Sequence, residues 1–247
     1  MANNTKTRGT ADIVILLDVT DSMDYCIDAI KNNIELLVQE LQSIDWRARI
    51  IGFRNYEHEP DNWIDADQSP FTKDPNELRR QIDSKVASGG DPDLDHLQES
   101  VLDALHYISQ IGVSPTVDQP DPFKWRKTGW TSKCVLLFTD AGCQETIRYI
   151  DGNMDIEDVI KAMEENHMRL SIVAPRSRDG DRQEYKCYDT FATAQLGKGE
   201  SAIYKDYGDH KSFPEVIKNN PFFKEIIKVF AKTVSETATR DFEEENQ

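Results

Sequence analysis

Oxygen-bearing side chains are concentrated in one short segment, residues 18–24, which reads DVTDSMD. Asp18, Thr20 and Ser22 occupy alternate positions, so their side chains can converge on one point where the chain turns. Carboxylate and hydroxyl oxygens favour a hard cation, above all Mg²⁺. One carboxylate and two hydroxyls do not enclose an ion, and Mg²⁺ usually retains water or an outside ligand. The same residue types are also preferred helix caps, so helix capping is the competing interpretation.

This segment lies between a predicted strand and a predicted helix. Residues 13–17 are all apolar and mostly β-branched, which is typical of a strand buried on both faces of a parallel sheet. From Ile27 to Ile44, apolar residues recur on one helical face. In open α/β sheets, ligands bind at the carboxyl ends of the strands, so the position favours a binding site.

Two further oxygen-rich loops follow at a distance in the sequence. Residues 134–138 form another apolar run, which ends in Thr139 and Asp140. Parallel strands end at the same edge, so neighbouring strands would bring Asp18 and Asp140 face to face. The loop at residues 89–93 contains Asp91 and precedes a predicted helix, whose start can lie on that same edge.

Strands and helices alternate along the whole chain, which predicts an α/β fold with a doubly wound, mostly parallel sheet. We expect residues 1–10 to be a flexible N-terminus, residues 11–238 to form one domain, and residues 239–247 to be an acidic, solvent-exposed tail. A short edge strand is expected near residues 63–64 or 70–72. The tryptophans of the long 112–132 connection are expected to pack. Further strands are expected at residues 47–54, 170–174 and 201–204, and helices at residues 75–86, 94–108, 156–163, 188–196 and 222–230. Asp74 is the expected cap of the 75–86 helix, because Pro75 follows it and Glu77 lies three residues after it.

Composition narrows the class of protein. The 247 residues carry a net charge of −16, which argues against a surface for nucleic acid or an anionic membrane. The sequence shows neither an apolar signal core nor a membrane-spanning run, so we expect a cytoplasmic protein. The four cysteines show no CxxC pair, and free thiols are expected for Cys26, Cys134, Cys143 and Cys187.

Five motifs in order resemble the von Willebrand factor A domain. The first, Asp18-x-Thr20-x-Ser22, looks like the metal-ion-dependent adhesion site motif DxSxS of that family, with Thr in place of the first Ser. The combination is similar to the intracellular branch linked to alpha-kinases. The other four motifs are Phe53-Arg54-Asn55-Tyr56, Gly89-Gly90-Asp91-Pro92, Trp125-Arg126 and Phe138-Thr139-Asp140-Ala141-Gly142.

The resemblance implies a six-stranded sheet with a Mg²⁺ or Mn²⁺ site at its edge. Thr20 and Ser22 would bind the ion directly, and Asp18 and Asp140 would act directly or through water. Asp91 stands where the family normally has Thr, so its role as a ligand is an open question. The expected metal-site residues are therefore these five, and no catalytic residue is expected.

For function, the resemblance implies a protein-interaction module that works as an adaptor. An Asp or Glu of a partner protein would complete the coordination of the ion. One alternative is a degenerate domain that binds partners without metal, which the altered residue Asp91 suggests. Another is a Mg²⁺-dependent phosphoryl-transfer enzyme. Thr20 stands where the aspartyl-phosphate pattern needs Asp, and no GxxxxGK(S/T) loop is present.

Overall fold

The computed structural model describes residues 9–87, 98–127, 131–176, 185–196, 200–204 and 211–245. Helices and strands alternate along the chain, as the sequence pattern predicts. The strands are β1 (Thr10–Asp18), β2 (Asp45–Phe53), β3 (Gln98–Glu99), β4 (Thr131–Phe138), β5 (Gly142–Cys143), β6 (Met168–Val173), β7 (Gln195–Leu196), β8 (Glu200–Ser201) and β9 (Ile203–Tyr204). The helices are α1 (Asp24–Glu40), α2 (Pro75–Asp83), α3 (Val101–Gln110), α4 (Ile156–Glu165), α5 (Lys186–Thr193), α6 (Phe213–Lys218) and α7 (Asn220–Glu245).

The main sheet has five described strands in the order β2-β1-β4-β6-β9, all parallel. The chain places β2 on one side of β1 and the later strands of this sheet, β4, β6 and β9, on the other side. The strand order therefore reverses between β1 and β4, where ligands bind in folds of this kind. The predicted α/β class and doubly wound arrangement are confirmed.

The expected sixth strand is not continuous in the part of the chain that the structure describes. Beyond β2, Thr72 and Ile64 each form one isolated antiparallel bridge, to Ala48 and Phe53 respectively. Pro70 lies in this segment and has no backbone N–H to donate, which disfavours a regular ladder there. The predicted edge segments therefore contact β2 without forming a strand.

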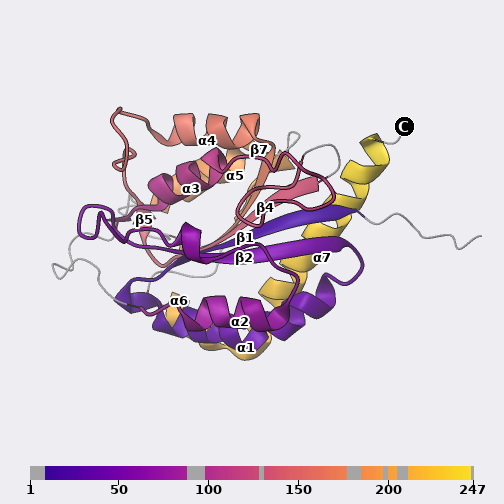
Figure 1. Ribbon diagram of the computed structural model, residues 1–247. Coiled ribbons are helices and arrows are strands. Elements are labelled where there is room, and N and C mark those ends of the chain that lie inside the picture. The colour runs from indigo at the N-terminus through magenta and orange to yellow at the C-terminus, as the bar shows by residue number, and fades with distance from the viewer. Residues whose placement is uncertain are drawn as a thin grey trace, which may run out of the picture.

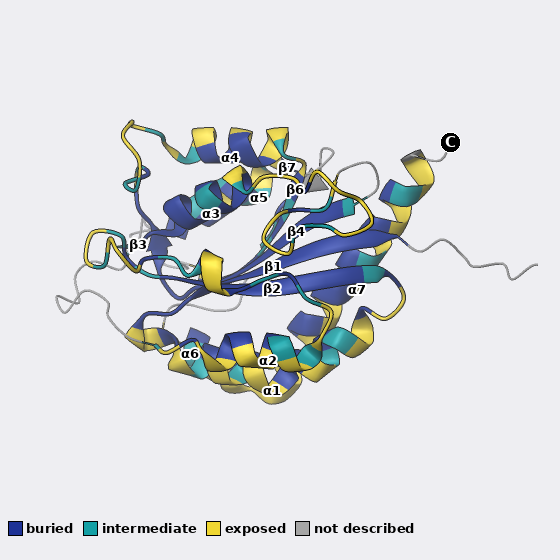
Figure 2. Ribbon diagram, viewed as in Figure 1, coloured by how far each residue is buried: buried dark blue, intermediate teal, exposed yellow. Residues whose placement is uncertain are grey.

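Helices cover both faces of the sheet. In Figure 1, α1, α2, α6 and α7 lie on one side of the strands, and α3, α4 and α5 lie on the other. Two apolar clusters result, one between the sheet and each helical layer. Figure 2 shows the strands buried and the outward faces of the helices exposed. Parallel strands need this double cover, and their uninterrupted apolar runs reflect it.

Most predicted helices form, with shifted ends. Asp74 caps α2 as expected, since its side chain accepts a hydrogen bond of 2.9 Å from the Asn76 amide. That helix ends at Asp83 instead of Val86. The prediction of a helix over residues 94–108 is wrong at residues 98–100, because residues 98–99 form β3 and α3 begins at Val101. The loop at residues 89–93 lies outside the described residues.

The acidic tail differs from its prediction. Helix α7 continues through it to Glu245, and Asp241 is buried at 3 % exposure. Its carboxylate forms an ion pair of 2.9 Å with Arg169 and accepts a hydrogen bond of 2.5 Å from Ser132. The tail was expected to be solvated, which is wrong at Asp241, because Arg169 on β6 supplies a buried positive charge.

A buried ion cluster joins the start of the sheet to the 112–127 loop. Asp12, fully buried in β1, accepts hydrogen bonds from Arg47 at 2.8 and 2.9 Å and from Arg126 at 2.6 Å. Trp125 is also fully buried, which confirms that it packs, whereas Trp130 lies outside the described residues. The 112–127 loop is therefore held in place by the ion pair of Arg126 with Asp12 and by the buried side chain of Trp125.

Candidate metal centre

The backbone after β1 brings alternate side chains together. Val19 stays in the sheet, because its amide donates to the Phe53 carbonyl at 3.0 Å. Thr20 is extended, with φ −71° and ψ 162°, and a single 3-10 turn then closes when the Met23 amide donates to the Thr20 carbonyl at 2.9 Å. This turn returns Ser22 to the side of Thr20.

Asp18 is the buried centre of a hydrogen-bond network. One carboxylate oxygen accepts from the Thr20 hydroxyl at 2.7 Å and from the Thr20 amide at 3.0 Å. The other accepts from the Thr139 hydroxyl at 2.8 Å. Thr139 comes from the end of the neighbouring strand β4, where Leu17 pairs with Phe138. The parallel register thus places the ends of β1 and β4 side by side.

Asp140 faces the same turn. It accepts a hydrogen bond from Ser22 at 3.1 Å and another from Tyr25 at 3.3 Å. The hydroxyl oxygens of Thr20 and Ser22 lie 3.4 Å apart. The structure therefore brings together four of the five predicted site residues in one continuous network.

The fifth predicted residue, Asp91, lies outside the described residues. The described chain resumes at Gln98, whose backbone pairs in parallel with Gly142, two residues after Asp140. Gln98 and Glu99 therefore lie beside the loop that follows Asp140.

Burial and mutual repulsion disfavour negative charge at this site. Burial is the larger cause, and the nearby Asp140 carboxylate adds to it, so that the pKa of Asp18 is raised to about 7. Burial also raises the pKa of Asp140, although the hydrogen bonds from Ser22 and Tyr25 oppose the shift. Among the described residues, no lysine or arginine forms an ion pair with Asp18. No positively charged side chain in the described part of the chain therefore offsets a negative charge on Asp18.

The donor set fits a hard divalent ion. It offers carboxylate and hydroxyl oxygens alone, which suits Mg²⁺ or Mn²⁺. Thr20 and Ser22 donate their protons to Asp18 and Asp140, which leaves lone pairs on both hydroxyl oxygens free for a metal. Adjacent ligands of an octahedral Mg²⁺ lie roughly 3 Å apart, since each bond is roughly 2.1 Å. The observed 3.4 Å between the hydroxyl oxygens is close to that spacing.

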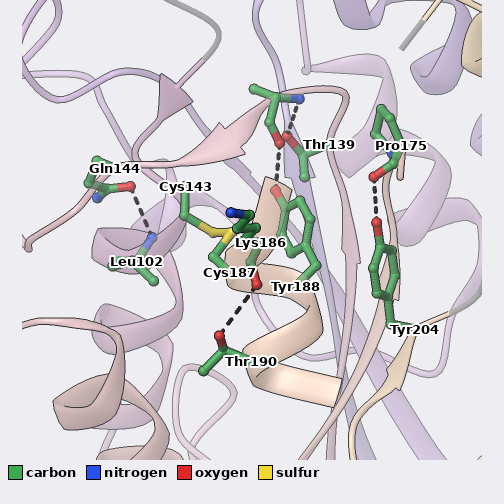
Figure 3. The surroundings of a disulfide bond; sticks show 11 residues. Leu102, Thr139, Cys143, Gln144, Pro175, Lys186, Cys187, Tyr188, Thr190 and Tyr204 are labelled. Atoms are coloured by element: carbon green, nitrogen blue, oxygen red, sulfur yellow. Dashed lines mark hydrogen bonds between the residues drawn. A yellow bond between two sulfur atoms is a disulfide. The ribbon is translucent and has the colours of Figure 1, made fainter. Parts of the chain in front are cut away.

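The loop after β4, residues 139–143, is fixed from the side by α5. Tyr185 donates to the Asp140 carbonyl at 3.0 Å, and Tyr188 donates to the Ala141 carbonyl at 2.6 Å. The Ala141 amide in turn donates to the Thr139 hydroxyl at 3.1 Å. Figure 3 shows Tyr188 reaching from α5 to this loop, beside a disulfide bond. The backbone that carries Asp140 is therefore held by two tyrosines.

That disulfide joins Cys143 to Cys187, across 44 residues of sequence and a Cα–Cα distance of 6.2 Å. The expectation of four free thiols is wrong for this pair, whereas Cys26 and Cys134 are buried thiols. Sequence spacing carries no signal for the pairing, because the two residues meet only after the chain has passed through α4 and β6.

Sequence reasoning missed the residues that hold the site in place. Tyr25, Tyr185 and Tyr188 are not among the predicted residues, and Thr139 belongs to a predicted oxygen-rich loop and a family motif without a role of its own in the site. Tyr25 carries a local signal, since it lies one turn after Ser22 at the start of a helix. Tyr185 and Tyr188 carry none, because their contacts cross about 45 residues.

Among the described residues, no group of three or more His, Cys, Asp or Glu side chains that could hold a metal ion is found, and the cluster around Asp18 and Asp140 contributes two carboxylates. No helix in the described ranges has the length and apolar character of a membrane span.

The architecture is compatible with a Rossmann-like or von Willebrand factor A-like fold. Comparison of the sequence with models of known protein families finds no match, and comparison with curated proteins finds none either. The geometry of the site itself therefore carries the functional argument.

Proposed function

We propose that this chain is a divergent von Willebrand factor A domain that binds Mg²⁺ or Mn²⁺ and captures a protein partner through that ion. Asp18, Thr20, Ser22 and Asp140 would hold the metal, with Asp91 as a fifth candidate. The partner would supply an Asp or Glu carboxylate. An adaptor role in the cytoplasm fits the acidic composition, which suits neither nucleic acid nor an anionic membrane.

The observation that carries the proposal is an oxygen cluster open on one side. Asp18 and Thr20 are buried, whereas Ser22 is exposed at the surface of the same network. Two carboxylates and two hydroxyls leave positions of an octahedral ion unfilled, and Mg²⁺ retains water or takes an outside oxygen in such positions. A partner carboxylate can therefore reach the ion from the Ser22 side.

The first test is calorimetric titration of Mg²⁺ and Mn²⁺ into the wild type and the variant Asp18→Asn. Asn keeps the size and can still accept hydrogen bonds, so the fold should survive, while saturable binding should be lost. Asp21→Asn is the matched control, because Asp21 is exposed, lies between Thr20 and Ser22, and should leave binding intact. Equal binding by the wild type and Asp18→Asn would refute the assignment of the site.

Mn²⁺ also reports whether the site is open. Water that remains bound to Mn²⁺ accelerates the relaxation of bulk water protons, so an open site should give strong enhancement. A short peptide with a single Asp should reduce the enhancement by displacing water, whereas the same peptide with Asn should not. A metal-loaded protein without enhancement would point to a closed, purely structural site.

One observation favours the metal-free alternative. The four side chains already satisfy one another by hydrogen bonds, and the raised pKa of Asp18 lets a proton take part of the role of a cation. An adaptor of that kind would show no heat on titration and no change in melting temperature with either ion. The calorimetric experiment separates the two proposals directly.

The proposal assigns no reaction to the site. Phosphoryl transfer needs positive charge beside the phosphate, and no described lysine or arginine pairs with Asp18. Metal-dependent hydrolysis of p-nitrophenyl phosphate that disappears in Asp18→Asn would instead identify an enzyme.

A further inference from the structure

The disulfide lies close to the proposed metal site in sequence and in space. Cys143 follows Asp140 by three residues and belongs to β5, which pairs with β3. Cys187 lies in the first turn of α5, between Tyr185 and Tyr188. Figure 3 shows the sulfur bridge and the ring of Tyr188 arriving at the same loop from the same helix.

Three links thus connect α5 to residues 139–143. Two are the hydrogen bonds from Tyr185 and Tyr188 to main-chain carbonyls, and the third is the covalent bridge. Tyr188 is fully buried, and its hydroxyl is satisfied within the 139–143 loop, by the Ala141 carbonyl and by the Thr139 side chain. The disulfide links α5 covalently to the same loop to which both tyrosines donate their hydrogen bonds.

The two cysteine residues differ in exposure. Cys143 is 4 % exposed, whereas Cys187 is only partly buried. Because Cys187 is the more exposed residue, we expect a thiolate from solution to attack its sulfur. In a reducing compartment, a disulfide of this kind is usually transient and sensitive to redox conditions.

We propose that Cys143 and Cys187 form a thiol–disulfide exchange site for a dithiol reductant, and that its state sets the cation affinity of the Asp18–Asp140 site. This inference rests on the proposed metal-binding function. The oxidised form holds α5 against the metal-site loop, and the reduced form leaves that task to the two tyrosines.

The exchange balances with one dithiol. Its first thiolate bonds to the Cys187 sulfur, the Cys143–Cys187 bond breaks, and Cys143 leaves with the electron pair and takes up a proton. The second thiol of the reductant then attacks the reductant's first sulfur, which is bonded to Cys187 in the mixed disulfide. That bond breaks, and Cys187 is released as a thiol. Two electrons and two protons pass to the protein, and the dithiol becomes a disulfide.

Thermodynamic linkage makes the proposal quantitative. If the bridge favours the geometry that binds Mg²⁺, bound Mg²⁺ must favour the bridge by the same factor. Couplings between sites typically reach about fivefold or more. Two independent measurements therefore have to return one number.

The experiment titrates Mg²⁺ calorimetrically into the oxidised protein and into protein reduced with dithiothreitol. The dissociation constant should rise by about fivefold or more on reduction. In a second measurement, the protein is equilibrated in mixtures of reduced and oxidised dithiothreitol, with and without saturating Mg²⁺. Thiol alkylation and mass spectrometry then give the reduced fraction, and Mg²⁺ should shift the midpoint ratio towards more reductant by the same factor.

Variants separate the bridge from the other cysteines. Cys143→Ser combined with Cys187→Ser should show the weak affinity with or without reductant. Cys26→Ala combined with Cys134→Ala removes the two buried thiols and should keep the full response. Tyr188→Phe retains the bridge and removes one hydrogen bond, so it should weaken Mg²⁺ binding in the oxidised form.

Each outcome has a distinct meaning. Equal Mg²⁺ affinity in both redox states, with an unshifted dithiothreitol midpoint, would overturn the redox coupling and leave the metal site standing. Absence of Mg²⁺ and Mn²⁺ binding in the oxidised protein would overturn the proposed function, and this inference with it. A response that persists in the Cys143→Ser, Cys187→Ser variant would assign the effect to other thiols.

Discussion

Asp18 and Asp140 show how a single pair of residues determines the chemistry of the site. Both carboxylates are buried, and each raises the cost of charge on the other, so the pKa of Asp18 is raised to about 7. A divalent ion would reverse that balance, because it favours the charged form of both groups. A metal bound as proposed would therefore compete with the proton for the same oxygens.

The competition predicts a pH dependence in the metal-free protein. Unfolded Asp18 titrates near its ordinary 3.8 and folded Asp18 near 7, so the folded state binds the extra proton between these values. The contribution of Asp18 to stability is therefore complete at low pH and is lost as pH rises through about 7. Melting curves should show that the free energy of unfolding of Asp18→Asn, relative to that of the wild type, increases by at least about 1 kcal/mol between pH 5.5 and pH 8.

Saturating Mg²⁺ serves as the control for that measurement. A metal bound as proposed would displace the proton, so Mg²⁺ should raise the melting temperature of the wild type more at pH 8 than at pH 5.5. A difference between wild type and Asp18→Asn that stays constant with pH would contradict the raised pKa.

At the scale of elements, prediction succeeded where the signal is local. The apolar runs 13–17 and 134–138 identified β1 and β4, and the caps at Asp74 placed the start of α2. The loop that follows β1 was recognised by residue type and spacing alone. These features depend on neighbours within a few residues, which the sequence displays directly.

Prediction failed where the partner is distant. The Cys143–Cys187 bridge and the burial of Asp241 against Arg169 depend on the order of the strands. Asp12 is a third case, because a buried carboxylate inside β1 is explained only by Arg47 and Arg126, from two other segments. No local pattern carries this information, so tertiary contact decides these residues.

The Asp12 cluster gives a prediction for β1 and its neighbours. Asp12→Ala removes the described ion partner of Arg47 and leaves Arg126 with Asp45 alone, and it should lower the free energy of unfolding by about 3–5 kcal/mol in urea denaturation. Asp83→Ala is the matched control, since it breaks only the exposed ion pair with Lys31 and should cost less than about 1 kcal/mol. If Asp12→Ala does not fold, Asp12→Asn provides the measurement. Equal losses for the buried and the exposed carboxylate would contradict the structural role of the cluster.

At the scale of the whole molecule, one covalent bridge joins β5 to the start of α5. The Cys143–Cys187 bond closes a loop of 44 residues that contains α4 and β6. Such a crosslink restricts the unfolded chain more than the folded one. The bridge therefore contributes to the stability of the helical layer formed by α3, α4 and α5.

Chain-entropy reasoning sets the size of that contribution. For this loop length, Cys143→Ser combined with Cys187→Ser should lower the free energy of unfolding by about 4 kcal/mol at 25 °C. Guanidinium denaturation of the oxidised wild type and the double variant measures the difference. Cys26→Ala with Cys134→Ala controls for the loss of two thiols elsewhere. A double variant as stable as the oxidised wild type would show that the bridge adds no net constraint.

The position of β1 has a mechanical consequence. This strand lies between β2 and β4, with parallel hydrogen bonds along nine residues on one side and eight on the other. Asp18 is its last residue, so tension applied by a tethered partner at the ion would run along the strand axis. The backbone hydrogen bonds on both sides would then be loaded in shear and would share the force, instead of opening one after another. A handle at the end of an interior strand, which is paired on both sides, thus resists extraction more than a handle on an edge strand would.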